Sequence, residues 1–288
     1  MSRVVWIGNS RNAKHGYTFL RNETFQFYKI RKYKEAIIYF YRSMSFTVSY
    51  WGRLGNQIIR NIAVSLLAQQ TNMHVTYSSH EFISKLGIDL FSGTKQYANT
   101  IKLTDQNYMS FYEQCYLYLN RNFGEVDAFL QTKDIISLIY NYLHSDKIKA
   151  SIINKNPFAK RYQHNNDVCI HIRLDDVSHH SPGLDYYQNT LSKITFDKLY
   201  LTTDQKNHAI VHKLISLYPT ATIIDYDEIQ TFQFASTCKH IILSHGSFSA
   251  IIGYLAYFSD VYYQEYDPST MWHGDMFSIP GWNKISKI

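Results

Sequence analysis

The sequence contains few of the residues that build disulfide-rich, metal-stapled or membrane-spanning proteins. Its three cysteines, Cys115, Cys169 and Cys238, are too scattered to form a disulfide framework or a CxxC metal site. No apolar run approaches the roughly 18 to 20 residues that cross a bilayer, and the apolar part of the N-terminus is too short for a signal peptide. These absences predict a cytoplasmic protein without a transmembrane segment, in which Cys169 and Cys238 act as small core residues.

Common fingerprints of nucleotide and acyl chemistry are also absent. The glycine-bearing stretch at residues 52–57 is not followed by the Gly-Lys-Ser/Thr of a Walker loop, and it does not match GxGxxG. Residues 244–249 lack the Gly-x-Ser-x-Gly elbow that a nucleophilic serine needs. A function therefore has to be inferred from the order of the strands and from the polar residues that follow them.

The bulk composition is that of an ordinary globular protein. The 288 residues are 45% hydrophobic and 18% charged, which is enough chain for two α/β lobes. A formal charge of +6 and a pI of about 9.0 suit an anionic small ligand, and they also allow nonspecific attraction to nucleic acid or an anionic membrane. The basic cluster at residues 29–34 is better explained as a solvated helix face. We therefore expect no nucleic-acid partner.

In the first part of the chain, the sequence pattern predicts a strand and a helix joined by a glycine-bearing loop. Residues 45–50 alternate in the manner of a strand, and residues 58–70 have apolar residues at helical spacing. The loop between them lets backbone N–H groups approach a phosphate or a sugar, although a tight turn packed on a sheet explains it equally well. The other expected elements are strands at 4–7 and 73–77, helices at 32–44 and 80–87, mainly helical structure at 127–154, and a polar linker at 154–166.

Beyond residue 166 the chain reads as a run of strand–helix units with short loops. This order predicts a parallel sheet with helices on both faces. The expected strands begin at Val168 and continue with 197–203, 221–224, 240–243 and a last strand at 261–263, and the expected helices cover 185–194, 205–217, 228–237 and 248–258.

Polar side chains follow three of these strands. His171 and Arg173 end the first strand, Asp204 follows the second, and Ser244 and Ser247 follow the fourth. Because the carboxyl ends of parallel strands meet at one edge of a sheet, we expect these side chains to converge there. The fixed fork of Arg173 binds phosphate oxygens at two points and would stabilise the charge of a leaving diphosphate.

Each of these residues also has a purely structural explanation. Arg173 could form a salt bridge with Asp175 or Asp176, and neither alternative is favoured by the sequence. Ser247 could cap the following helix rather than contribute to an anion site. Asp204 could cap a helix rather than accept hydrogen bonds from a nucleobase.

Two acids and two adjacent histidines are of the residue types that hold metal ions, but the sequence does not favour a metal site at either pair. Asp225 and Asp227 precede a helix, where aspartate caps the helix and complements its dipole. His179 and His180 are adjacent, so we expect their rings to point apart, and no cysteine is near to complete a site. We therefore predict no metal site, while either histidine could serve as a general base near neutral pH.

Six stretches in the right order resemble the α-1,2-fucosyltransferase family and its wider fucosyltransferase superfamily. Residues 52–57 resemble that family's Gly-Gly-Leu-Gly-Asn-Gln loop, and residues 171–176 resemble its His-x-Arg-Arg-Gly-Asp motif. The resemblance covers most of the chain from residue 46 on. The other four stretches are the Tyr-Tyr at 186–187, the Thr-Thr-Asp turn at 202–204, the segment from Cys-Lys-His to Ser-Phe-Ser at 238–249, and the closing Pro-Gly-Trp-Asn-Lys-Ile at 280–285.

The resemblance implies a GT-B fold, an α/β architecture in which two Rossmann-like lobes with parallel sheets face each other across a cleft. The acceptor-side lobe would span residues 1–160, and the GDP-sugar-binding lobe would span residues 161–288, whose final segment could pack back on the first lobe. The implied reaction is an inverting, metal-independent transfer of L-fucose from GDP-fucose to a glycan hydroxyl, without a cofactor. The implied donor-binding residues are Gly55, Asn56, His171, Arg173, Asp204, Ser244, Ser247 and Phe248.

By the same resemblance Arg173 would hold the β-phosphate, while the general base stays open. The candidates are Asp175, Asp176, His179 and His180, of which Asp176 and His179 join Arg173 as the expected catalytic residues. A direct assist from the leaving phosphate is an equal alternative.

The chain departs from the family pattern at several positions. Leu174 stands where the motif has its second arginine, and Asp175 stands where it has glycine. The membrane anchor of animal members is missing, so the resemblance is to the soluble bacterial or viral type, and a viral protein would act in the host cytoplasm. The alternatives are a transferase of another GDP-linked sugar and an inactive nucleotide- or carbohydrate-binding protein, with a basic nucleic-acid binder ranked last.

Overall fold

The computed structural model describes most of the chain after residue 45. The predicted strand at 4–7, the predicted helix at 32–44, the basic cluster at 29–34 and Cys115 lie outside the described residues. Phe46–Ile288 forms one compact unit. None of the helices in the described residues combines the length and apolar character that a membrane span requires. The described residues are 46–48, 52–97, 99–114, 121–126, 128–271 and 273–287.

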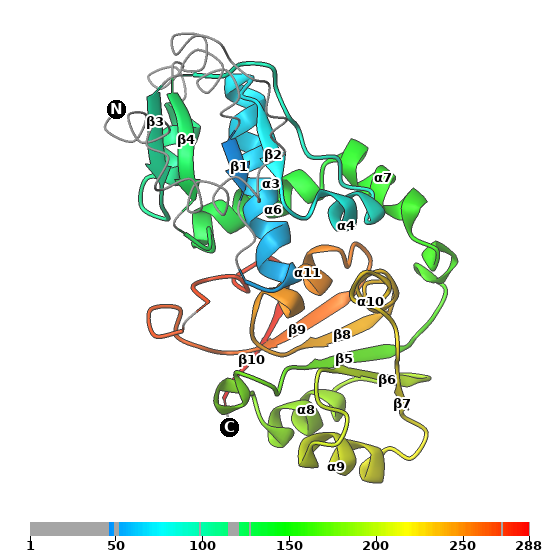
Figure 1. Cartoon of the computed structure of the whole chain (residues 1–288). Coiled ribbons are helices and arrows are strands. Elements are labelled where there is room, and N and C mark those ends of the chain that lie inside the picture. Colours follow the sequence, from blue (N-terminus) through cyan, green and yellow to red (C-terminus); the bar gives the residue numbers. More distant parts are fainter. Residues whose placement is uncertain are drawn as a thin grey trace, which may run out of the picture. The chain divides into compact units, whose positions relative to one another are not determined.

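A six-stranded parallel sheet forms the centre of the C-terminal half of this unit (Figure 1). Its strand order is β10-β9-β8-β5-β6-β7. Strands β5 and β8 lie in the middle with every side chain buried, as expected for strands covered on both faces. The parallel α/β sheet predicted from the sequence is confirmed. The strands are β5 (Val168–Ile172), β6 (Leu199–Thr203), β7 (Thr222–Ile223), β8 (His240–Leu243), β9 (Asp260–Gln264) and β10 (Asn283–Ile285).

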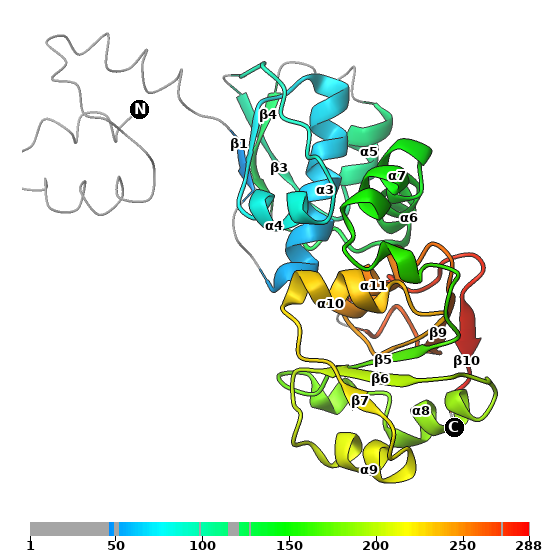
Figure 2. The ribbon, with the colours of Figure 1, turned by 90° about the vertical axis from the view of Figure 1, so that its right-hand side faces the viewer.

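Helices cover both faces of this sheet, as predicted. Helices α8 and α9 lie on one face, and α10 and α11 lie on the other (Figures 1 and 2). Successive residues of β5 divide between two cores, because Ile170 joins the core with α8 and α9 while Cys169 joins the core with α10 and α11. Cys169 and Cys238 are both buried, as predicted. The helices are α8 (Leu184–Leu191), α9 (Ala209–Leu217), α10 (Glu228–Ala235) and α11 (Ser247–Tyr254).

The last strand of the sheet was not predicted. The sequence indicated that the strand at 261–263 would end the sheet, but β10 pairs in parallel with β9 on its outer side, with Asn283 opposite Tyr262. The Asn-Lys-Ile sequence of β10 has no run of β-branched or aromatic residues, and two of its three side chains are exposed. Its strand character comes from the ladder with β9 rather than from its own composition.

The N-terminal part of the unit is built around one long helix, α3, which is buried along most of its length. Two separate two-stranded parallel sheets, β1-β2 and β3-β4, accompany it in the described residues, so a second Rossmann-like sheet stays a prediction. The strands are β1 (Phe46–Val48), β2 (Val75–Tyr77), β3 (Asn99–Leu103) and β4 (Arg121–Val126), and the helices are α3 (Leu54–Thr71), α4 (His80–Lys85), α5 (Tyr108–Glu113), α6 (Lys133–Leu143) and α7 (Asp146–Lys155).

Two helix boundaries differ from the predicted ones. The predicted helical stretch at 127–154 is two helices, because the backbone of Ser145 is extended at the N-cap of α7. Helix α3 begins at Leu54 rather than at residue 58, with Arg53 in an extended conformation at its N-cap. Gly55 and Asn56 therefore belong to the first turn of α3 rather than to the loop before it, and this turn lies against α11 (Figure 1).

Candidate functional site

The candidate site lies where the strand order of the large sheet reverses. Strand β5 has β6 on one side and β8 on the other, so the connections that follow β5 and β8 run in opposite directions. Ligands of open α/β sheets bind at such a switch point, outside the carboxyl ends of the strands. Here Arg173 follows β5 and Ser244 follows β8, and the Arg173 N–H donates to the Ser244 hydroxyl oxygen at 3.3 Å.

Five charged side chains gather at this edge, and we refer to them as the charge cluster. Arg173 is mostly buried, with 15% of its side chain exposed. Its Nε lies 3.1 Å from Asp204 Oδ2, and its Nη2 donates to Asp176 Oδ1. Arg173 thus holds a fixed orientation at the strand end, with Asp176 and not Asp175 as its neighbouring acid. The members of the charge cluster are Arg53, Arg173, Asp175, Asp176 and Asp204.

Asp204 fixes the backbone that carries Arg173. One carboxylate oxygen accepts from the Leu174 N–H at 2.8 Å, and the other accepts from the Asp175 N–H at 3.3 Å. The helix-cap alternative is wrong, because the N-cap of α9 is His208, whose Nδ1 accepts from the backbone N–H two residues on. Asp204 joins the end of β6 to the turn after β5, and both of its oxygens are engaged in doing so.

Arg53 is the member of the charge cluster that the sequence did not single out. Its guanidinium reaches across from the N-cap of α3, with Nη2 lying 2.8 Å from Asp175 Oδ2 and 3.4 Å from Asp176 Oδ2. Its Nη1 lies 3.7 Å from Asp204 Oδ2. The signal available in the sequence is the position of Arg53 in the glycine-bearing loop at 52–57, between a predicted strand and a predicted helix. Leu174 itself is buried among apolar residues.

The electrostatic balance of the charge cluster favours the ionised form of Asp176. Partial burial acts to raise the pKa of Asp176, but the hydrogen bond from Arg173 and the charges of Arg173 and Arg53 outweigh burial and hold this pKa below its usual value. Asp176 is therefore a weak base while both arginines contact it. A ligand that drew the two guanidinium groups away from Asp176 would make this carboxylate a stronger base.

The first turn of α3 packs directly on the first turn of α11. A Cβ atom on Gly55 would lie 2.6 Å from the backbone nitrogen of Phe248 and 2.6 Å from the backbone carbonyl carbon of Ser247, so only glycine fits. Asn56 turns away from this contact, and its Oδ1 accepts from Gln131 Nε2 at 2.8 Å. The close packing explains why Arg53, two residues before Gly55, reaches the charge cluster.

His171 is enclosed beneath the same helix. Its ring stacks on Phe248 with centroids 5.1 Å apart, and its Nδ1 forms a hydrogen bond with the Ser249 hydroxyl. Burial, aided by the charge of Arg173, lowers the pKa of His171 to about 3, so the imidazole is neutral. His171 thus supports the start of α11, where Ser247 is also nearly buried.

His179 and His180 lie on a short 3₁₀ helix (Ser178–His180) after the charge cluster. Their ring centroids are 4.1 Å apart, so the expectation that the rings point apart is wrong. The 3₁₀ turn rotates successive side chains less than a strand does, and the two rings can meet. His179 is exposed and lies three residues from Asp176 along the chain.

Asp225 and Asp227, the acids that the sequence analysis weighed as metal ligands, have other partners. Asp227 is the N-cap of α10, where its carboxylate accepts from the Gln230 N–H at 2.7 Å, and Asp225 accepts from Lys206 Nζ at 2.6 Å. In the part of the chain that the structure describes, no group of three or more His, Cys, Asp and Glu side chains is arranged to hold a metal ion.

The chain is an α/β protein with a parallel sheet, and the charge cluster lies at the switch point where such sheets bind their ligands. No protein-family model and no curated protein matches the chain. Among solved structures, the chain is similar to a mutant of Arabidopsis thaliana FUT1 in complex with GDP, with a TM-score of 0.46 and 12% sequence identity. The match covers 88% of this chain and 76% of that chain. The chemistry of the site rests on the contacts of its own residues and not on this likeness.

Proposed function

We propose that the protein is an inverting glycosyltransferase that binds the diphosphate of GDP-fucose at the charge cluster and transfers L-fucose to a glycan hydroxyl, in α-1,2 linkage. The observation that carries the proposal is the approach of two guanidinium forks, Arg173 from the end of β5 and Arg53 from the N-cap of α3, to the same carboxylates. A diphosphate offers the same kind of oxygen acceptors as those carboxylates. The family-like motifs at 52–57 and 171–176 support the donor assignment.

In this reaction an acceptor hydroxyl oxygen forms a bond to fucose C1 from the face opposite the diphosphate. The bond from C1 to the β-phosphate oxygen breaks, and its electron pair stays on that oxygen. Arg173 and Arg53 stabilise this developing charge more in the transition state than in the ground state. The hydroxyl proton goes to Asp176, Asp175, His179 or His180, or to the leaving phosphate itself. Ser244 supports this edge, because its hydroxyl oxygen accepts from the Arg173 N–H.

A thermal-shift measurement with nucleotides tests this proposal. We expect GDP and GDP-fucose to raise the melting temperature, and we expect UDP, UDP-sugars and EDTA to leave it unchanged, because guanine recognition and metal independence belong to the proposal. A shift confined to UDP or to divalent metal would overturn it. A GDP shift without sugar transfer or donor hydrolysis would identify a binding protein instead of an enzyme.

A further inference from the structure

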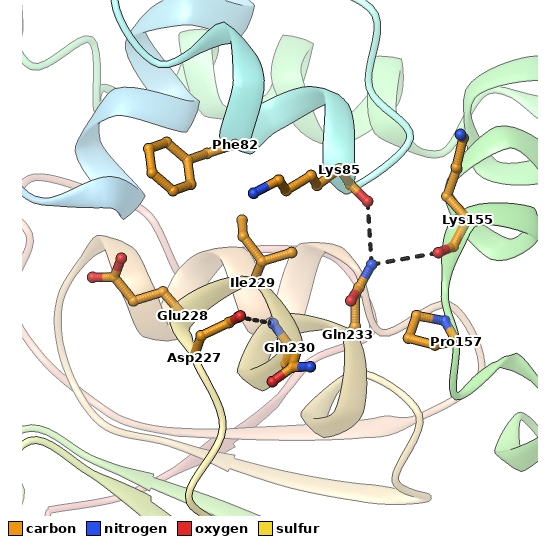
Figure 3. A pocket seen from close by; sticks show the side chains of 9 residues that line it. All are labelled: Phe82, Lys85, Lys155, Pro157, Asp227, Glu228, Ile229, Gln230 and Gln233. Carbon is orange, nitrogen blue, oxygen red and sulfur yellow. Dashed lines mark hydrogen bonds between the residues drawn. The ribbon is translucent and has the colours of Figure 1, made fainter.

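A pocket of about 420 Å³ opens between α4, the end of α7 and the start of α10 (Figure 3). Its volume falls within the range of about 300–1,000 Å³ that small-molecule sites occupy. Phe82 and Lys85 project from α4 on one side, and Glu228 and Ile229 of α10 lie opposite them. None of these side chains belongs to the charge cluster, so the pocket is a separate feature of the molecule.

The walls of the pocket are held together by one buried amide, that of Gln233. Its Nε2 donates to the Lys85 carbonyl oxygen at 3.2 Å and to the Lys155 carbonyl oxygen at 3.5 Å. The backbone carbonyl oxygen of Gln233 accepts a further hydrogen bond from Asn156 Nδ2 at 2.8 Å. Because these bonds join α10 to the ends of both α4 and α7, the pocket is formed before any ligand enters.

The lining of the pocket suits an uncharged ligand that is rich in hydroxyl groups. Phe82 is 46% exposed and offers an aromatic ring to the apolar C–H face of such a ligand, while Lys85 Nζ lies 5.3 Å from the centre of that ring. Lys85 brings its ammonium group and Glu228 its carboxylate to the pocket, whereas the side chain of Lys155 points away and its carbonyl oxygen bonds to Gln233 (Figure 3). One ammonium group and one carboxylate supply donors and acceptors without a net positive charge that would favour a phosphate.

Segments next to the charge cluster continue along the chain into α4 and α10, the helices that form two walls of this pocket. Ser78, two residues before α4, donates from its hydroxyl to Gln57 Oε1 at 3.1 Å, in the first turn of α3. Asp225, shortly before α10, accepts from Lys206, which lies two residues after Asp204. An acceptor sugar has to be held by elements next to those that hold the donor, and α4 and α10 meet that condition.

We propose that this pocket binds an uncharged saccharide and serves as the acceptor-sugar site of the transferase. Its role as an acceptor site rests on the proposed function, whereas saccharide binding itself does not. The exposed ring of Phe82 would stack on the sugar, and the Glu228 carboxylate would accept hydrogen bonds from its hydroxyl groups.

Ligand-observed NMR on the full chain tests the proposal with lactose, N-acetyllactosamine and chitobiose as probes. We expect at least one of these sugars to bind, and we expect Phe82→Ala and Glu228→Gln each to weaken that binding at least fivefold. Leu217→Ala is the matched control for Phe82, because Leu217 is 42% exposed and lies on α9, on the other face of the sheet. Glu113→Gln, at the exposed end of α5, is the control for Glu228.

Binding of GDP is measured on the same variants, so that failure of this inference is distinguishable from failure of the proposed function. The inference requires that Phe82→Ala and Glu228→Gln leave the GDP affinity within twofold of the starting protein. Loss of GDP affinity in either variant would assign the pocket to the donor and overturn the inference. Absence of saccharide binding, or equal loss in the controls, would also overturn it, whether or not GDP binds.

Discussion

If the charge cluster binds a diphosphate as proposed, the Asp175 carboxylate competes with it for Arg53, and removal of this carboxylate is the sharpest test of the charge cluster. Asp175 Oδ2 lies 2.8 Å from Arg53 Nη2, and both side chains are 48% exposed. The substitution Asp175→Asn keeps the size of the side chain and removes its charge. Because a bound phosphate oxygen would accept from the same guanidinium group and lie close to this carboxylate, we expect GDP to bind the variant more tightly than it binds the starting protein.

The distances set the size of the effect. A phosphate oxygen that accepts from Nη2 at about 2.9 Å lies no further than about 6 Å from Asp175 Oδ2. At that separation, with an effective dielectric constant of about 40–80 for half-exposed groups, the repulsion between two unit charges is about 0.7–1.4 kcal/mol. This corresponds to a Kd that falls about threefold to tenfold. Folding stability should change by about 1 kcal/mol or less, because the ion pair is half exposed.

Isothermal titration with GDP at low and high salt measures this effect. The gain in affinity should shrink at high salt, because the two charges are partly screened. Asp225→Asn is the control, since it changes the net charge equally while Asp225 pairs with Lys206 outside the charge cluster. Weaker GDP binding in Asp175→Asn would show that this carboxylate contacts the ligand, and an equal gain in the control would reveal a general charge effect. Either result would refute the competition.

Three other predictions follow from the geometry. Arg173→Ala should lower kcat/KM for donor turnover at least about 100-fold with an unchanged circular dichroism spectrum, and undiminished transfer would remove Arg173 from the mechanism. Gly55→Ala should lower the free energy of unfolding in urea by roughly 1–3 kcal/mol, because its Cβ would meet backbone atoms of α11 at 2.6 Å; an unchanged midpoint would contradict that packing. Burial lowers the pKa values of His245 and His273, whose ring centroids are 5.5 Å apart, to about 4 each. The unfolded chain then binds more protons between pH 6.5 and 4, so stability should fall as the pH falls through that range, by up to roughly 3 kcal/mol per histidine. Urea unfolding as a function of pH checks this, and a His273→Gln variant with the same pH dependence would argue against it.

The sequence by itself predicted five of the six strands of the sheet, and it singled out four of the five members of the charge cluster. Strands β5 and β8 are short apolar runs between turn signals, and such runs form strands wherever helices can cover both faces. The order of strands and helices then required a parallel sheet. Arg173 follows β5 directly, so its position at the carboxyl edge follows from local sequence alone.

Only the tertiary structure decided that Arg53 meets the other charged side chains at that edge. Arg53 and Asp175 are 122 residues apart, and no local pattern couples them. The same holds for β10, whose strand character comes from its neighbour, and for the pocket, whose walls Gln233 joins across three helices. Local periodicity depends on residues a few positions apart, whereas these contacts join distant parts of the chain, and those of Arg53 depend on how closely α3 and α11 pack. The absent side chain of Gly55 sets that distance.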